Sequence, residues 1–253
     1  MEWRGHLPRS KPQDIAPAIK SLNVLNKKII ECNACARLEK WCKTVASEKR
    51  RAYAEEEYWG RPIPSFGPTD AKILIVGLAP GAHGANRTGR IFTGDRSGDW
   101  LYGSLYRNGL AKIPTSTARN DGQELYGTRI ACAVRCAPPE NKPSTEESAR
   151  CAPYLLREVE LLLPTVRSFL VLGNFAWKAL LNTFQSLDPV AFKEYLRPLP
   201  RFGHGASFRI VLRDGVERYV VGSYHPSQQN TFTGKLTEGA LDAVVKIAVK
   251  RAR

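Results

Sequence analysis

The stretch AKILIVGLAPGAHGANRTGRIFTGDRSGDWL, residues 71–101, joins a short apolar run to a long glycine-rich segment. The run AKILIV is typical of a buried strand. The segment from Gly77 to Leu101 carries six glycines, and its only carboxylates are Asp95 and Asp99. Because a loop with few Cβ atoms lets a planar or anionic group approach the backbone, its N–H groups can hydrogen-bond that group. The stretch therefore predicts a binding loop at the end of a sheet strand.

Further apolar runs alternate with helical patterns along the chain. Strands are predicted within residues 127–136, 166–173 and 218–226, with one more at 207–212 in an otherwise irregular segment, 186–217. Helices are predicted over 15–30 with Asp14 as N-cap, 97–110, 146–163 with Ser144 or Thr145 as N-cap, 174–184 and 237–252. This alternation predicts an α/β fold whose parallel sheet is covered on both faces.

Ligands of such sheets bind at the carboxyl ends of the strands. Here these ends carry the glycine loop, the segment CAPPENKP (136–143) and the segment YHPSQQN (224–230). All three segments are rich in glycine, proline, asparagine or histidine. We therefore expect the functional site at this edge of the sheet.

The chain is strongly basic. Its 253 residues include 38 Lys and Arg against 24 Asp and Glu, a formal net charge of +14. A basic surface attracts polyanions, so the charge favours contact with nucleic acid over a surface that merely happens to be basic. No apolar run reaches the length of a membrane span, and MEWRGHLPRSKPQDI at the N-terminus has no apolar signal core. We therefore expect a cytoplasmic protein with no membrane contact.

The cysteines suggest a metal site. Cys32 and Cys35 have the CxxC spacing of a ligand pair, and Cys136 and Cys151 flank the segment APPENKPSTEESAR. Clustered thiols in a cytosolic protein more often indicate metal or catalysis than disulfides, and four thiolates suit either zinc or an iron–sulfur cluster. Cys132, inside a predicted strand, is interpreted as a small buried hydrophobe. Cys42 is either an outlier or an alternative ligand.

The glycine loop does not carry the usual nucleotide-binding motifs. The pattern G-x-G-x-x-G is absent, and GANRTGRI (84–91) fails as a P-loop because Arg90 and Ile91 replace the lysine and the hydroxyl residue. A nucleotide-binding enzyme is therefore disfavoured. A nucleobase read by hydrogen bonds and by stacking on Phe92 fits the loop better.

Four motifs together resemble those of a known family. The segments CNAC, GLAPGAHGANRTGRIFTGD, RCAPPENKP followed by a cysteine, and YHPSQQN are similar to those of the uracil-DNA glycosylases, more narrowly their type 5 branch. The resemblance implies one domain over 1–253, with 1–29 as an N-terminal helical extension. It also implies a three-layer α/β/α fold with a short, mostly parallel central sheet. The cofactor it implies is a structural [4Fe–4S] cluster held by Cys32, Cys35, Cys136 and Cys151.

The resemblance also implies a reaction. A damaged base is flipped out of DNA, water attacks C1′ of its sugar, and uracil leaves as an anion, so that an abasic site remains. His225 matches the histidine that hydrogen-bonds uracil O2, although a lone histidine is often a satisfied structural residue. Asp95 matches the acid that guides the water, and it could equally cap the helix that begins near Ser97.

Other positions match residues that contact the base. Gly81 and Ala82 belong to the loop that faces it, Phe92 matches the stacking aromatic and Asn141 an asparagine at the base. The alternatives are core packing for Phe92 and a turn residue for Asn141. Cys132 stands where the type 4 branch has an asparagine that reads the uracil edge. We therefore predict a wider range of substrates, uracil and other deaminated bases such as hypoxanthine.

DNA contacts are predicted at Arg87, Arg90, Ser227 and Gln229, although each one alone could be solvated surface. The protein is expected to act on DNA as a monomer associated with the nucleoid. The main rival is a non-catalytic iron–sulfur or zinc module that binds nucleic acid. That rival explains the charge and the cysteines, but not Asp95 and His225 on neighbouring loops.

Overall fold

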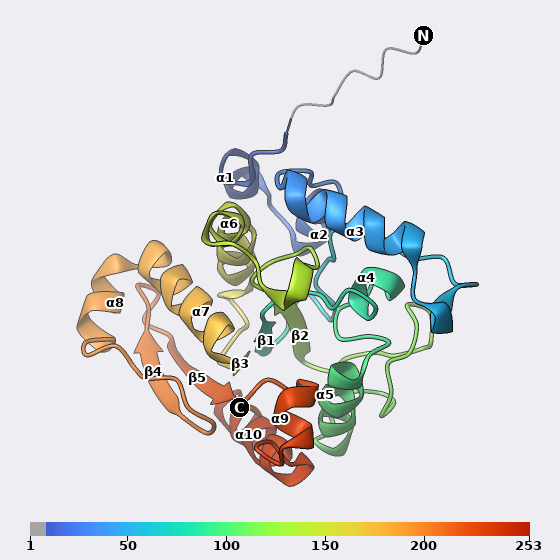
Figure 1. Ribbon diagram of the computed structural model, residues 1–253. Helices are drawn as coiled ribbons and strands as arrows, with labels where there is room; N and C mark the ends of the chain where they lie inside the picture. The colour runs from blue at the N-terminus through green and yellow to red at the C-terminus, as the bar shows by residue number, and fades with distance from the viewer. Residues whose placement is uncertain (1–8) are drawn as a thin grey trace.

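A five-stranded sheet forms the centre of the computed structural model, which describes residues 9–253 (Figure 1). Its strands are β1 (Ile73–Gly77), β2 (Thr128–Cys132), β3 (Ser168–Leu172), β4 (Ser207–Val211) and β5 (Glu217–Ser223), in the order β2-β1-β3-β5-β4. All neighbours are parallel except β4, which pairs antiparallel with β5 at one edge. The predicted strands and the mostly parallel sheet are confirmed.

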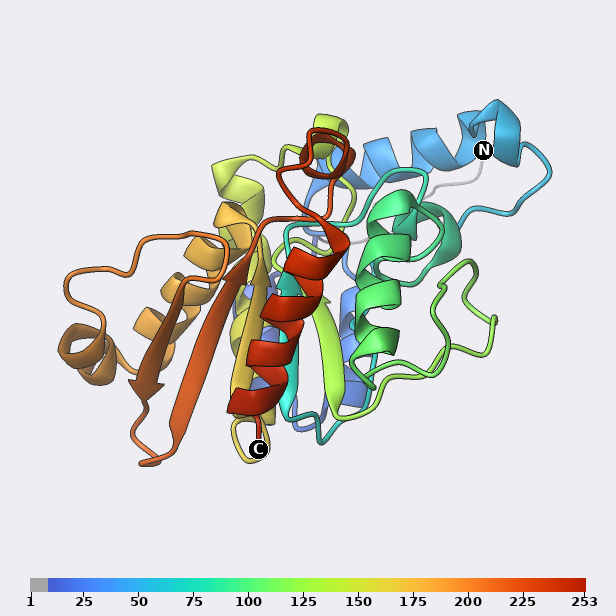
Figure 2. The same cartoon turned by 90° about the horizontal axis from the view of Figure 1, so that it is seen from below.

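Helices cover both faces of this sheet. Side chains alternate along β1, so that Leu74 and Val76 lie in one hydrophobic core while Ile73 and Ile75 lie in the other. Helices α2 (Leu22–Ile30), α6 (Thr145–Leu162) and α7 (Asn174–Leu187) pack on the first face. Helices α5 (Arg96–Arg107) and α10 (Glu238–Arg251) pack on the second, which Figure 2 shows from the front. The predicted three-layer α/β/α fold is confirmed.

The N-terminal segment differs from the single helix expected over 15–30. The chain forms α1 (Pro12–Ile15) and the 3-10 helix η1 (Ala16–Ala18), and α2 then begins after Ser21. Ile19 is extended between them, and the Ser21 side chain accepts a hydrogen bond from the Val24 N–H, so Ser21 and not Asp14 is the N-cap. This segment packs on α6 and shares its core. The remainder of the predicted extension, 1–8, lies outside the described residues.

Several short helices complete the chain: α3 (Ala36–Glu48), η2 (Arg51–Tyr53), α4 (Ala85–Thr88), η3 (Pro139–Asn141), α8 (Pro189–Tyr195) and α9 (Gln228–Phe232). Helix α8 corrects the expectation that 186–217 is irregular apart from one strand. It begins at a proline, and the Asp188 side chain caps it by accepting from the Ala191 N–H at 3.1 Å. Of the two caps predicted for α6, Ser144 is the one that forms, in a capping box with Glu147.

The loops that follow β1, β2 and β5 gather at one end of the sheet (Figure 2). This end carries the glycine loop with α4, the 3-10 helix η3, and α9. Within residues 9–253, no helix combines the length and the apolar character needed to cross a bilayer.

Candidate active site

A cavity of about 1070 Å³ opens at this end of the sheet. The structure brings most of the predicted site residues together on its wall: Gly81, Ala82, Phe92, Asp95, Asn141, His225, Ser227 and Gln229. They come from the loops after three different strands, as the fold requires of a site at the carboxyl edge. Arg87 and Arg90 do not line the cavity.

Asp95 lies between the glycine loop and α5. Its Oδ1 accepts a hydrogen bond from the Gly98 N–H at 3.0 Å, so the residue is the N-cap of α5. Its Oδ2 lies over the loop, because a Cβ on Gly84 would stand 1.9 Å from this oxygen and a Cβ on Gly81 would stand 2.9 Å away. Glycine at these two positions therefore makes room for the carboxylate. The capping role is confirmed, and the same residue still faces the cavity.

The electrostatics of Asp95 are unusual for a capping residue. Burial raises the pKa of its carboxyl group, and the charge of Asp99 acts in the same direction, while the hydrogen bond from Gly98 and the charge of Arg87 oppose them. Among residues 9–253, no lysine, arginine or histidine forms an ion pair with Asp95. A carboxylate with a raised pKa and no ion-pair partner is a better proton acceptor than an ordinary surface aspartate.

His225 follows β5 and lies beside Phe92, with ring centroids 5.7 Å apart. Burial lowers the pKa of His225 to about 4, so its imidazole is neutral near pH 7. A neutral imidazole carries one N–H donor and one acceptor. The Asn230 side chain donates to the His225 carbonyl at 2.8 Å and so ties this loop to α9. The arrangement places a neutral imidazole on the cavity wall.

Phe92 packs in the hydrophobic core and also lines the cavity. Its side chain is 6% exposed, and its backbone has a positive φ of 51°. A Cβ on Gly77 would lie 2.9 Å from the ring, so the glycine that ends β1 lets the ring lie across the strand end. Cys132 is buried in β2 beside the same point, which confirms its interpretation as a small buried residue.

Asn141 stands at the end of η3 and is exposed on the cavity wall. Its φ is 57°, directly after Glu140 at 54°. Two left-handed residues in a row make a tight turn, and asparagine tolerates this conformation better than most residues. The turn interpretation therefore holds, and the turn leaves the side chain at the cavity.

A second cavity, of about 250 Å³, lies among the predicted metal ligands. Cys32 and Cys35 reach it from the segment between α2 and α3, Cys136 from the loop after β2, and Cys151 from α6. The Arg135 backbone N–H donates to the Cys151 sulfur at 3.3 Å. Within the described part of the chain, no three His, Cys, Asp or Glu side chains are grouped closely enough to hold a single ion. The four thiols line the same cavity together with other side chains.

Cys42, whose role the sequence left open, also lines this second cavity from α3. Its thiol is buried and donates to the Ala137 carbonyl at 3.5 Å. The structure therefore places a fifth cysteine beside the four predicted ligands.

Comparison with known proteins identifies the family. Residues 64–248 match the family model described as the uracil DNA glycosylase superfamily. The chain belongs to the uracil-DNA glycosylase superfamily. It is 45% identical over 238 residues to a type-5 uracil-DNA glycosylase of Mycobacterium tuberculosis, covering 94% of this chain and 84% of the relative. The type-5 enzymes of Mycobacterium leprae (47% over 232 residues, 92% and 96%) and Thermus thermophilus (48% over 207 residues, 81% and 87%) are similar too.

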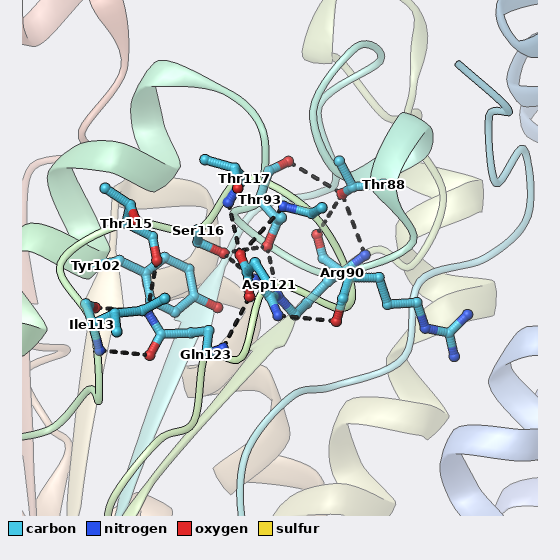
Figure 3. A network of polar contacts seen from close by, with 12 residues as sticks. Thr88, Arg90, Thr93, Tyr102, Ile113, Thr115, Ser116, Thr117, Asp121 and Gln123 are labelled. Atoms are coloured by element: carbon cyan, nitrogen blue, oxygen red, sulfur yellow. Dashed lines mark hydrogen bonds and ion pairs between the residues drawn. The ribbon is translucent and has the colours of Figure 1, made fainter.

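Two arginines of this superfamily member differ from their predicted role. Arg90 is only 4% exposed. It donates to Ser116 Oγ at 2.7 Å and to Thr93 Oγ1 at 3.0 Å, and it pairs with Asp121 at 2.5 Å. The network in Figure 3 ties the glycine loop to the segment 113–123. The predicted DNA contact of Arg90 is wrong, because its guanidinium is enclosed by these partners.

Arg87 is likewise an internal residue, 7% exposed. It donates to the His83 and Gly94 carbonyls, each at 2.8 Å, pairs with Glu56 and stacks over the Tyr53 ring at 3.8 Å. Its predicted phosphate contact does not fit this position. Arg87 instead joins both ends of the glycine loop, and it positions the backbone next to Asp95.

Ser227 and Gln229 remain at the cavity, where Ser227 stands directly before α9 and Gln229 is exposed. The residues of the cavity wall that sequence reasoning missed include Trp41, Arg50, Tyr53 and His83. His83 lies within the glycine loop, so its position was available from the sequence. The other three come from α3 and the turn after it, where no motif marks them.

Proposed function

We propose that this chain is a monofunctional uracil-DNA glycosylase, which takes uracil out of DNA and hydrolyses its N-glycosidic bond, leaving an abasic site. The observation that carries the proposal is that a carboxylate without an ion-pair partner and a neutral imidazole line one cavity beside a buried aromatic ring. The named activity of the type-5 relatives supports it.

In this proposal each residue has a distinct task. The flipped base stacks on Phe92, and the His225 N–H hydrogen-bonds its O2. As the bond from C1′ to the base breaks, the electron pair leaves with the base, and a donor aimed at the growing negative charge stabilises the transition state. Because His225 is neutral, it acts as a hydrogen-bond donor and keeps its proton. A water molecule held by Asp95 attacks C1′, its oxygen stays on the sugar, and Asp95 accepts the released proton.

The range of bases follows from what lines the cavity. Gly81 and Ala82 offer backbone and a small side chain to the base, and Asn141 offers an amide on an exposed turn. Cys132 is enclosed within β2 and does not belong to the wall. A site with few edge-specific groups and a volume of about 1070 Å³ would also accept larger deaminated bases such as hypoxanthine.

We further propose that Cys32, Cys35, Cys136 and Cys151 hold a [4Fe–4S] cluster with a structural role. The assignment is supported by the one cavity that all four cysteines line. Such a cluster would cross-link the segment before α3, the end of β2 and α6. The two cavities share no lining residue, and hydrolysis requires no electron transfer, so the cluster has no step in the reaction.

The physiological setting follows from charge and substrate. A net charge of +14 supports association with DNA, and we propose a monomer that works in the cytoplasm at the nucleoid.

The test is a strand-cleavage assay. The purified protein is incubated with a duplex that carries one uracil opposite guanine, and alkali then breaks the strand at any abasic site. Asp95→Ala and His225→Ala proteins are run in parallel, with binding to the same duplex as control. Cleavage by the wild type that both variants lose, with binding retained, supports the proposal. Binding without cleavage of uracil or hypoxanthine by the wild type points instead to the non-catalytic nucleic-acid-binding module.

The cofactor needs its own measurement. Broad visible absorption and a measured content of about four iron atoms per chain would support the cluster. Zinc in place of iron would contradict it.

A further inference from the structure

One part of the cavity wall is not used by the proposed chemistry. Helix α3 ends at Glu48, and the next residue, Lys49, has a φ of 53° that turns the chain toward η2. The turn brings Arg50 and Tyr53 to the cavity, next to His83 of the glycine loop. This wall therefore combines a guanidinium group with an imidazole.

The hydrogen bonds of Tyr58 define the tautomer of His83. Tyr58 is 7% exposed, and its hydroxyl accepts from the backbone N–H of Arg50 at 3.3 Å. The same hydroxyl lies 3.1 Å from His83 Nδ1. A buried hydroxyl group needs an acceptor for its hydrogen, and His83 Nδ1 is the one available among the described residues. We assign Tyr58 as the donor to Nδ1, and with this assignment Nε2 carries the hydrogen of the neutral ring.

The charges on this wall keep His83 neutral. Burial lowers the pKa of His83, and the guanidinium groups of Arg50 and Arg87 lower it further. His83 can therefore act as a donor through Nε2 without adding positive charge.

Arg50 is available to an external partner. Its side chain is exposed, and among residues 9–253 it forms no ion pair with a carboxylate. Glu56, from the same stretch of chain, pairs with Arg87 instead. A free guanidinium next to a neutral N–H donor has the chemistry of an anion site, since both groups donate and neither accepts.

We propose that Arg50 and His83 form a phosphate subsite, which holds one backbone phosphodiester of the DNA strand whose damaged base enters the cavity. This inference rests on the proposed function, because it takes DNA as the ligand. A phosphodiester is favoured over the edge of a base because it is an anion and because phosphate contacts fix the register of a protein on DNA. The subsite would hold the strand while the base lies in the cavity.

The first test measures affinity without catalysis. The wild type, Arg50→Met and the matched control Arg51→Met are titrated with a duplex that carries one tetrahydrofuran abasic analogue, over a range of salt concentrations. Arg51 is the exposed neighbour of Arg50 and does not line the cavity. We expect Arg50→Met to weaken binding about tenfold and to lower the slope of log K against log[salt] by about 0.9, as the loss of one phosphate contact requires. An affinity and slope equal to those of Arg51→Met would overturn the subsite.

The second test locates the phosphate. Each phosphate near the abasic analogue is replaced in turn by a neutral methylphosphonate. One replacement should weaken the wild type and leave Arg50→Met unchanged, since the variant has already lost that contact. Equal losses for both proteins at every position would overturn the proposal.

The third test concerns His83. His83→Ala should weaken binding at the same phosphate, and Tyr58→Phe should weaken it less, because the ring stays but its tautomer is no longer fixed. Thermal unfolding verifies that both variants fold. A loss of affinity that does not depend on the position of the methylphosphonate would show that His83 does not contact this phosphate, and it would overturn the part of His83 in the subsite. If the proposed function were wrong, the wild type would not excise uracil, but these effects on binding would remain. The two failures are therefore distinguishable.

Discussion

Glu158 and Asp95 are both withdrawn from water, but the protein treats their charges in opposite ways. Glu158 on α6 is fully buried and accepts from Arg129 at 2.7 Å, from Ser65 at 2.7 Å and from Arg135. Burial would raise the pKa of its carboxyl group, but Arg135 and Arg129 hold that pKa below its ordinary value. Asp95 has no such partner, and the pKa of its carboxyl group is raised.

This difference between the two carboxylates indicates that the charge of Glu158 stabilises the fold, whereas the charge of Asp95 is available for chemistry. A carboxylate that is paired on both oxygens is a poor proton acceptor, and removing it leaves buried arginines without a partner. A carboxylate without a cation is costly to keep ionised, and this is what makes it reactive. The same contrast distinguishes Arg90, which is paired with Asp121, from Arg50, which has no such partner among residues 9–253.

The largest effect is expected from removing the charge of Asp95. Asp95→Asn should lower the single-turnover rate of uracil excision by about 10²- to 10⁴-fold, the range for loss of a general base. Its free energy of unfolding should change by less than about 0.5 kcal/mol, because asparagine caps a helix as well as aspartate does. Rapid quench on the uracil duplex and urea unfolding measure the two quantities. A stable variant that retains its rate would remove Asp95 from the reaction.

Glu158→Gln should mainly affect stability, whereas Asp95→Asn should mainly affect the rate. We expect the free energy of unfolding to fall by about 3–5 kcal/mol, because Arg129 and Arg135 would remain buried without their anion. Glu160→Gln, on the same helix, is the control, since the partly exposed pair with Arg157 should contribute less than about 1 kcal/mol. Urea unfolding at pH 7 compares the two variants. Equal losses would show that the buried network does not depend on its charge.

Substitution of His225 tests whether its side chain donates a hydrogen bond to the base. His225→Ala should lower the excision rate by about 10²- to 10³-fold, as the loss of one donor to a developing negative charge does elsewhere. Binding of the abasic duplex should be nearly unchanged, since that ligand lacks the base. A variant that loses binding and rate together would show that His225 mainly shapes the loop before α9.

Gly84→Ala tests the space that Asp95 occupies. The new Cβ would stand 1.9 Å from Asp95 Oδ2, so the carboxylate must move. A displacement of about 1 Å from a productive geometry can cost about 100-fold in rate, so we expect a loss of about 10- to 100-fold. Gly239→Ala on α10 is the control, because a Cβ there meets nothing within 4 Å. Equal excision rates for the two variants would contradict the close approach of Asp95 to the loop.

The fold was largely predictable because its signals are local. Each strand is a short apolar run, and Ser144 with Glu147 is a complete capping box within four residues. The break after α1 was missed because the apolar spacing of 15–30 continues through Pro17 and Ser21. Helix α8 was missed because its start, Asp188 followed by proline, lies in a segment otherwise rich in turn residues.

The site was predictable where a motif marks it, and otherwise not. Asp95, His225 and Phe92 belong to recognisable segments, and they do meet in one cavity. The burial of Arg87 and Arg90 depends on Glu56 and Asp121, which lie about thirty residues away along the chain, and no local pattern shows which acid an arginine will reach. The wall formed by Arg50 and Tyr53 depends in the same way on where α3 ends.

The pH dependence of single-turnover excision tests the contrast between the two carboxylates most directly. Asp95 must be ionised to accept a proton, and the pKa of its carboxyl group is raised. The wild-type rate should therefore fall as the pH decreases through this raised pKa. In Asp95→Asn the residual rate should show no such decline. If the variant kept the same acidic limb as the wild type, the limb would belong to another group, and Asp95 would not be the base.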